Sequence, residues 1–373
     1  MRQRYLIGKL NRERYIESKQ QNDAGSFLDN TYNPNQIYIQ STTVPRALQS
    51  SYAEMMGMYP PNTKTFQQLT EAEKQSLKQG KGMPRIKLSN GKVQAFEHHF
   101  ESIVDNYQMI PVFTYSQQTI NDDILFWGCP WAQSKKSQTE GVADTFKTIQ
   151  DEYLEILKYP LVQAFKIPND FINNITFPWI AELEDYQIAY DFEGQPRMYN
   201  YSPIEYEYLR HAQVKYLTIP VGEEGRQLIV TKELSKPINA MLQRVQEILS
   251  KNPSRDTLRY MIYSGHDDGI SNTLLFLDPV NFEFEDVPYT SQVYFELYYD
   301  DDCVNQVKDH SCFTMKIAFN GHPLKFDTCM DANTSRGSTS PFCRFDDFIK
   351  HYNKKSYKGD YIEACSRPYT PGQ

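Results

Sequence analysis

The spacing of apolar residues changes period along the chain, and this change predicts an α/β fold. Residues 37–40 form a short β-rich run, and three further runs rich in β-branched and aromatic side chains cover 258–264, 293–299 and 313–319. Between the first two of these runs, the pattern over 65–252 is mainly helical. A long helical stretch between two strand-bearing regions predicts a cap inserted into an α/β domain.

The opening residues predict an amphipathic helix. Leu6 and Leu10, with Tyr5 and Ile16 nearby, fall on one face, and Arg and Lys fall on the other. No capping residue precedes this helix, which indicates that Met1 lies within the helix and not at its start. We therefore expect further sequence upstream of Met1.

The next predicted helix carries Arg46. Residues 37–40 form the preceding strand, Thr43 is the expected N-cap, and Pro45 fits the first turn. Apolar residues then recur at helical spacing until Pro60 ends the helix. Arg46 therefore lies in the first turn of a helix that follows a strand, where α/β proteins bind anions.

Further helices are predicted from capping and spacing. They comprise a capping box at 70–73, an apolar stripe of Val142, Phe146, Ile149, Tyr153 and Leu157, helical patterns over 204–217 and 232–249, and a C-terminal helix over 344–352.

A second candidate ligand site follows the run over 258–264. This run ends in Gly265-His266-Asp267, and the helical pattern resumes over 270–277. Ligands bind at the carboxyl ends of strands in open α/β sheets, so His266 and Asp267 are expected to face a crevice. Together with Arg46 they suggest a phosphate pocket; the alternative is a solvated turn without a function.

Composition and net charge limit the classes of function that the chain can have. The chain has 373 residues, 40% of them hydrophobic, with a net charge of −8. This acidic balance without a basic stripe argues against nucleic acid or an anionic membrane as partner, and no apolar run reaches the length of a membrane span. His98-His99 and the acidic runs lack metal-ligand spacing and are interpreted as surface groups, so neither a metal nor a cofactor is expected.

Six cysteines, mostly late in the chain, favour disulfides over metal binding, because no CxxC motif is present. Three N-glycosylation triplets, at Asn174, Asn200 and Asn333, agree with a protein of the secretory pathway. The alternative is a cytosolic protein with six free thiols.

Several segments, in the same order along the chain, resemble the histidine acid phosphatase family. The matching segments are 3–8 with 12–15, 39–46 with 50–53 and 57–61, 263–267, and 287–289 with 295–297. The resemblance implies an α/β core, an open mixed sheet flanked by helices, with an inserted and mainly helical cap. It also implies hydrolysis of small phosphate monoesters at acid pH through a phosphohistidine.

The family nucleophile belongs to an Arg-His-Gly-x-Arg motif on the first strand, and no Arg-His-Gly occurs in this sequence. Arg210-His211-Ala212 lies in a predicted cap helix and is no substitute. We therefore expect the chain to lack the first strand, the nucleophile and two phosphate-binding arginines, and to be inactive alone. The alternative is a secreted, non-catalytic relative that binds phosphate esters or acts as an interaction protein.

The resemblance assigns three residues of the pocket. Arg46 matches the arginine that holds phosphate oxygens, His266 the histidine that binds phosphate and stabilises the transition state, and Asp267 the general acid. Asp268 stands where the family usually has a hydroxyl residue. A second carboxylate there is expected to raise the pKa of the acid or to weaken anion binding.

The resemblance also implies the bridges Cys129–Cys365 and Cys329–Cys343, and we infer a third, Cys303–Cys312, across the turn between two strands. The expected division is 1–64 for the first part of the core, 65–252 for the cap, and 253–373 for the rest of the core and the tail. Disulfides imply export, so we expect a secreted, lysosomal or vacuolar protein whose signal peptide precedes Met1. A homodimer is a further possibility that the family suggests.

Overall fold

The computed structural model describes residues 1–18, 26–61, 70–79, 81, 85–95, 109–116, 122–124, 128–140, 144–250, 257–283, 286–329 and 341–371. They form two compact units, one of Met1–Thr114 with Arg255–Ser264, the other of Tyr115–Ser254 with Gly265–Gln373. Both combine helices with strands, which confirms the α/β class. The division into 1–64, 65–252 and 253–373 as core and cap stays a prediction.

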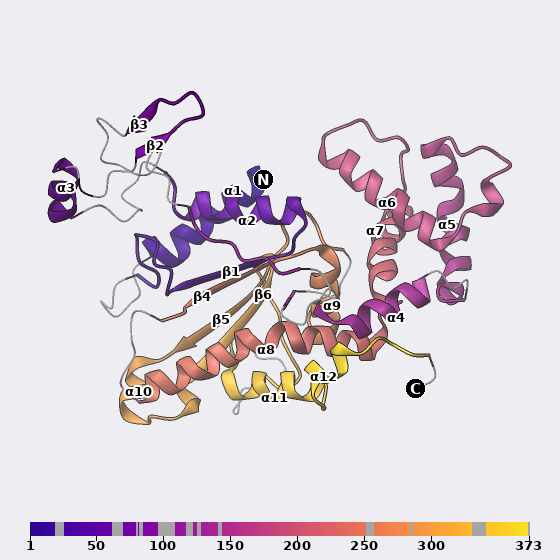
Figure 1. Cartoon of the computed structure of the whole chain (residues 1–373). Helices are drawn as coiled ribbons and strands as arrows, with labels where there is room; N and C mark the ends of the chain where they lie inside the picture. The colour runs from indigo at the N-terminus through magenta and orange to yellow at the C-terminus, as the bar shows by residue number, and fades with distance from the viewer. Residues whose placement is uncertain are drawn as a thin grey trace. The chain divides into compact units, whose positions relative to one another are not determined.

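The first unit is built around a parallel strand pair (Figure 1). Strand β1 (Ile37–Ser41) pairs with β4 (Tyr260–Ser264), with Ile37 opposite Tyr260 and Ser41 opposite Ser264. The core beside this pair contains the buried side chains Ile16, Leu28, Ile37, Ile39, Met55, Met58, Ile110 and Ile262. Both strands lie where the sequence predicts them.

Helix α1 (Arg2–Arg12) buries a different face from the predicted one. Leu6 and Leu10 are 60% and 51% exposed, whereas Gly8 and Asn11 are buried. A Cβ atom at Gly8 would collide with the backbone of helix α2 (Pro45–Met58), and one at Gly57 would collide with the backbone of α1. The two helices therefore pack at glycines, side by side in Figure 1, and this close approach overrides the apolar stripe.

Buried polar groups fix the same helix pair. Glu54 of α2 (Pro45–Met58) is 3% exposed; its carboxylate accepts from Asn11 at 2.9 Å and lies 3.1 Å from Arg4. Burial raises the pKa of Glu54, while Arg4 and Asn11 lower it. The predicted N-cap at Thr43 is wrong: the N-cap residue is Val44, and its side chain makes no capping bond, while Pro45 occupies the first turn as expected.

The rest of the first unit comprises short elements. Helix α3 (Glu71–Lys78) begins with the predicted capping box, in which the Thr70 N–H donates to Glu73 and the Glu73 N–H donates back to Thr70 Oγ1. Strands β2 (Arg85–Lys87) and β3 (Val93–Ala95) pair antiparallel.

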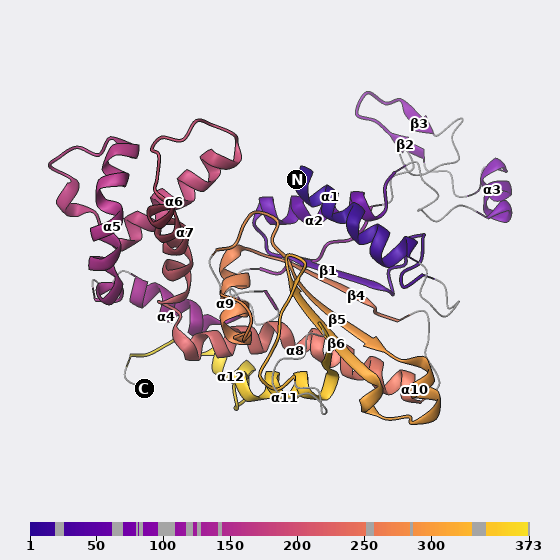
Figure 2. The ribbon, with the colours of Figure 1, turned by 180° about the vertical axis from the view of Figure 1, so that it is seen from behind.

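Three helices of the second unit form a bundle, visible in Figure 2: α5 (Lys147–Phe165), α6 (Phe177–Phe192) and α7 (Pro203–Thr218). A short 3-10 helix, Ile172–Asn174, connects the first two. Phe146, Tyr153 and Leu157 of the predicted stripe are buried in the bundle core, while Val142 lies outside the described residues. The helical pattern over 204–217 is confirmed by α7.

The second unit also contains an antiparallel sheet of β5 (Val293–Tyr299), β6 (Phe313–Phe319), β7 (His322–Pro323) and β8 (Cys343–Arg344). Its other elements are α4 (Pro130–Glu140), α8 (Gly222–Leu249), α9 (Asp267–Leu277), α10 (Asp301–Gln306), the 3-10 helix His310–Cys312, α11 (Phe345–Lys355) and α12 (Tyr361–Ser366). Among the described residues, no helix combines the length and apolar character that a bilayer crossing needs.

All three expected disulfides are present: Cys129–Cys365, Cys303–Cys312 and Cys329–Cys343. The first joins the chain just before α4 to α12, across 236 residues of sequence. No cysteine is free, so the alternative with six thiols is wrong.

Candidate active site

Arg46 lies in the first turn of α2, and its side chain is exposed. The carboxyl ends of β1 and β4 are adjacent, because Ser41 pairs with Ser264 and the Thr42 N–H donates to the Ser264 carbonyl at 3.1 Å. Ser264 Oγ donates to the Ala47 carbonyl, also at 3.1 Å. The end of β4 is thereby fixed against the turn that carries Arg46, at the strand edge where α/β proteins bind ligands.

His266 and Asp267 belong to the second unit, where they open helix α9. His266 is the N-cap residue, with extended backbone at φ −131° and ψ 173°, and Asp267 is the first helical residue. Asp267 Oδ1 accepts the Asp268 N–H at 3.0 Å. The helix therefore begins ahead of the predicted start at Ile270, because carboxylates in a first turn stabilise the helix dipole.

Asp268 lies in a desolvated position. Desolvation, opposed by Lys136 and supported by Asp267, raises its pKa to about 6. Its Oδ1 atom is buried without a hydrogen-bond partner. On α8, desolvation and then the Asp268 carboxyl raise the pKa of Glu233 to about 8. The residue that departs from the family pattern thus belongs to a set of carboxyl groups that hold protons unusually well.

Sequence reasoning missed a second buried carboxyl, Glu184 of α6, which is fully buried. Its pKa is raised to about 9, chiefly by burial and also by the carboxyl groups of Asp185, Asp286 and Asp267, while Arg210 opposes the shift. Arg210 holds Asp286 with two bonds, of 2.8 and 2.5 Å. Helical spacing places Glu184 among the buried residues Ile180, Ala181 and Gln187, and this was the signal available in the sequence.

Comparison with known proteins decides the family. The profile of the histidine phosphatase superfamily, branch 2, matches residues 1–320. The chain belongs to this superfamily. It is 26% identical over 326 residues to prostatic acid phosphatase of Rattus norvegicus; the match covers 80% of this chain and 65% of that relative.

Solved structures of histidine-phosphatase phytases share the fold. The Citrobacter braakii phytase has a TM-score of 0.53 at 12% identity, covering 97% of this chain and 88% of its own. The Hafnia alvei phytase in complex with myo-inositol hexakis sulphate has a TM-score of 0.54 at 11% identity, covering 98% and 88%. These likenesses agree with the expected histidine-phosphatase-like fold.

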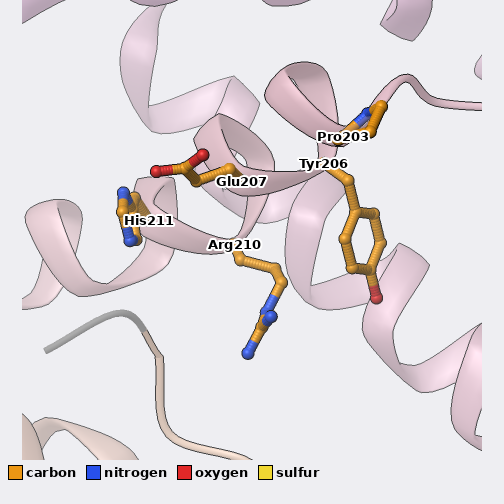
Figure 3. Close-up of a pocket in the computed structure, with 5 residues that line it drawn as sticks. All are labelled: Pro203, Tyr206, Glu207, Arg210 and His211. Atoms are coloured by element: carbon orange, nitrogen blue, oxygen red, sulfur yellow. The ribbon is translucent and has the colours of Figure 1, made fainter.

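Arg210 and His211 lie on helix α7, in agreement with the helical pattern predicted there. They line a pocket of about 190 Å³ together with Pro203, Tyr206 and Glu207, all from the same helix (Figure 3). His211 Nε2 is buried without a hydrogen-bond partner.

The remaining candidates are His98-His99 and the acidic runs. His98-His99 lies outside the described residues. In the part of the chain that the structure covers, no group of three His, Cys, Asp or Glu side chains is arranged to hold a metal ion.

Glu184 makes the stability of the second unit depend on pH. Its folded-state pKa of about 9 lies above the ordinary 4.5, so its stabilising contribution is complete below pH 4.5 and declines as pH rises toward 9. Glu184→Gln cannot ionise, and we expect it to be more stable than the wild type at pH 8, by roughly 4 to 5 kcal/mol, with little difference at pH 4.5. Urea unfolding at both pH values measures this.

The matched control is Glu182→Gln, at an exposed position of the same helix, which should leave the pH dependence unchanged. A wild type and a Glu184→Gln variant that lose stability in parallel between pH 5 and 8 would contradict the role of Glu184.

Proposed function

We propose that this chain is part of an acid phosphatase that hydrolyses small phosphate monoesters through a phosphohistidine. Support comes from membership of the superfamily and from the similarity to a protein named prostatic acid phosphatase. The observation that carries the proposal is that the carboxyl ends of β1 and β4 lie side by side and are held by hydrogen bonds. There Ser264 bonds to the first turn of α2, which bears Arg46, and His266 follows Ser264 by two residues.

Each of the three residues has a chemical role in this proposal. The Arg46 guanidinium offers paired, charge-assisted donors to phosphate oxygens and stays ionised. His266 donates to the phosphoryl group and stabilises the charge of the transition state. Asp267 protonates the oxygen of the leaving alcohol. The family nucleophile belongs to an Arg-His-Gly-x-Arg motif, which does not occur in residues 1–373.

We further propose that the protein is secreted or lysosomal. Three disulfides agree with an oxidising compartment. In two of the three N-glycosylation triplets the acceptor residues, Asn174 and Asn200, are exposed, while Asn333 lies outside the described residues. A homodimer stays a prediction.

Phosphate binding to the 373-residue chain tests the two binding residues. We expect titration calorimetry to detect inorganic phosphate, and Arg46→Ala and His266→Ala each to weaken its binding about tenfold or more, because bonds to a charged group are strong. Arg2→Ala, at an exposed arginine in the first turn of α1, should change nothing. The chain should show no phosphatase turnover without its nucleophile.

Sequencing the 5′ end of the transcript then distinguishes the acid phosphatase from the alternative, a non-catalytic relative that binds phosphate esters. An upstream Arg-His-Gly-x-Arg segment, with turnover in the longer protein, supports the enzyme. A transcript that starts at Met1, combined with phosphate binding, favours the non-catalytic relative. Turnover by the 373-residue chain itself that is lost in His266→Ala would contradict the proposed nucleophile.

A further inference from the structure

His351 of helix α11 is a buried histidine whose two ring nitrogens both contact acceptors. Its side chain is 1% exposed. The Nε2 atom lies 2.6 Å from the Leu277 carbonyl oxygen, and the Nδ1 atom lies 3.1 Å from Asp327 Oδ1. The Phe326 ring lies against the imidazole, with ring centroids 4.7 Å apart. Since these contacts fix the orientation of the ring, the protonation of each nitrogen follows from its partner.

Both ring nitrogens need a proton in this arrangement. A carbonyl oxygen can only accept a hydrogen bond, and so can an ionised carboxylate. Asp327 is ionised because the Lys354 ammonium donates to it at 2.9 Å; this bond, and also that of His351, lowers the pKa of Asp327. A neutral imidazole has a single donor nitrogen and would leave one of the two contacts unmade. The geometry therefore requires an imidazolium at His351.

The bond from His351 reaches the C-terminal end of helix α9. Leu277 is the last residue of α9, and the last carbonyls of a helix have no donor within it. They also carry a partial negative charge, yet the last turn of α9 contains no basic residue. Helix α11 supplies the charge instead: besides His351, Lys355 contacts Asp278, the C-cap residue of α9, at 2.7 Å. The end of α9 is therefore held by two cations of a neighbouring helix.

The opposite end of α9 carries two residues of the candidate site. His266 is the N-cap residue, and Asp267 is the first helical residue. The helix has 11 residues and is about 16 Å long. A helix of this length is rigid, so an anchor at its C-terminal end helps to fix the position of its first turn.

We propose that His351 is a positioning residue: as an imidazolium it donates from both ring nitrogens, anchors α9, and thereby holds His266 and Asp267 in place. Asp327 orients the ring and balances its charge, while the bond to Leu277 acts on the helix. The anchor does not depend on any reaction, whereas its effect on phosphate rests on the proposed function.

Nitrogen-15 NMR of the 373-residue chain, labelled at its histidines, tests the protonation of the ring. At about pH 7.5 free histidine is mostly neutral, with one protonated ring nitrogen, and serves as the reference. We expect His351, assigned by the loss of its signals in His351→Gln, to show two protonated nitrogens at that pH. A single protonated nitrogen overturns the inference, because one of the two bonds would then be missing.

Two substitutions each keep one of the bonds. The amide nitrogen of Gln lies as many bonds from Cβ as Nε2 of His, and that of Asn as many as Nδ1. His351→Gln can therefore still donate to Leu277, whereas His351→Asn can donate only to Asp327. We expect calorimetry with inorganic phosphate to show about threefold to tenfold weaker binding for His351→Asn, the measure of one hydrogen bond, and a change within about twofold for His351→Gln. Both variants should lose thermal stability.

The matched control is Lys350→Gln, at an exposed residue of α11 that contacts Asp347 of the same helix and should change neither quantity. Equal weakening of phosphate binding by Asn and Gln at position 351, or no weakening by either, overturns the positioning role and leaves His351 as a residue that only stabilises the fold.

The proposed function fails by a different result, in which phosphate binds independently of Arg46 and His266. Hydrogen exchange of the α9 amides then tests the anchor alone. Faster exchange in His351→Asn than in His351→Gln supports the anchor, and equal exchange in the two variants contradicts it.

Discussion

Replacing both Cys129 and Cys365 by serine is expected to lower the free energy of unfolding by about 5 kcal/mol, the largest stability effect that we predict. The bridge spans 236 residues of sequence, so its removal frees a very large loop in the unfolded chain. Both cysteines are fully buried, and the serine hydroxyls would lose solvation as well. Denaturant unfolding followed by tryptophan fluorescence measures the change.

The matched control is the double serine variant at Cys303 and Cys312. This bridge closes only 9 residues, for which the same chain-entropy argument gives between about 2 and 3 kcal/mol. The double substitution avoids leaving a single reactive thiol in either variant. A long-bridge variant that loses no more stability than the short-bridge one would show that loop entropy does not determine the effect.

The strands and most helices could be predicted because local chemistry and burial agree there. β1, β5 and β6 are short apolar runs bounded by polar residues, and the predicted stripe through Tyr153 and Leu157 faces the core of the bundle. The capping box at Thr70 follows from two side chains three residues apart. Such elements need no knowledge of distant contacts.

Helix α1 was predicted, but its buried face was not, because its packing depends on a distant segment. The buried face is made by Gly8 and Asn11, which carry little apolar surface. Only the approach of α2, with Gly57 at the crossing and Glu54 as partner of Asn11, explains why these residues are inside. An apolar stripe cannot reveal a contact that is made by backbone.

The candidate site was predictable where the motif is continuous in sequence and not where it is assembled from helices. Arg46, His266 and Asp267 each follow a strand, so local pattern and family resemblance both indicate them. Glu184 comes from a separate segment, helix α6, and Asp267 contributes to its raised pKa. This pKa depends mainly on desolvation, which the sequence of α6 alone does not give.

Asn in place of Asp267 is expected to slow the cleavage of alkyl phosphates by about 10²–10⁴-fold in the complete phosphatase, the range that general acid catalysis contributes. An alkyl phosphate would leave as an alkoxide unless it is protonated, so it needs the acid. An aryl phosphate such as nitrophenyl phosphate leaves as a stable phenolate and should lose far less. Phosphorylation rates of a form of the protein that carries an Arg-His-Gly-x-Arg segment, measured for both ester types, test this.

The substitution Asp267→Asn tests the catalytic role without disturbing the start of helix α9. Asp267 Oδ1 accepts the Asp268 N–H, and the carbonyl oxygen of Asn can accept the same bond, so Asp267→Asn should keep the start of α9. Arg46→Ala should instead slow both esters alike, because it removes a contact to the phosphoryl group that they share. Equal losses for both esters in Asp267→Asn, or none, would exclude the acid role and leave Asp267 as a group that only supports the first turn of the helix.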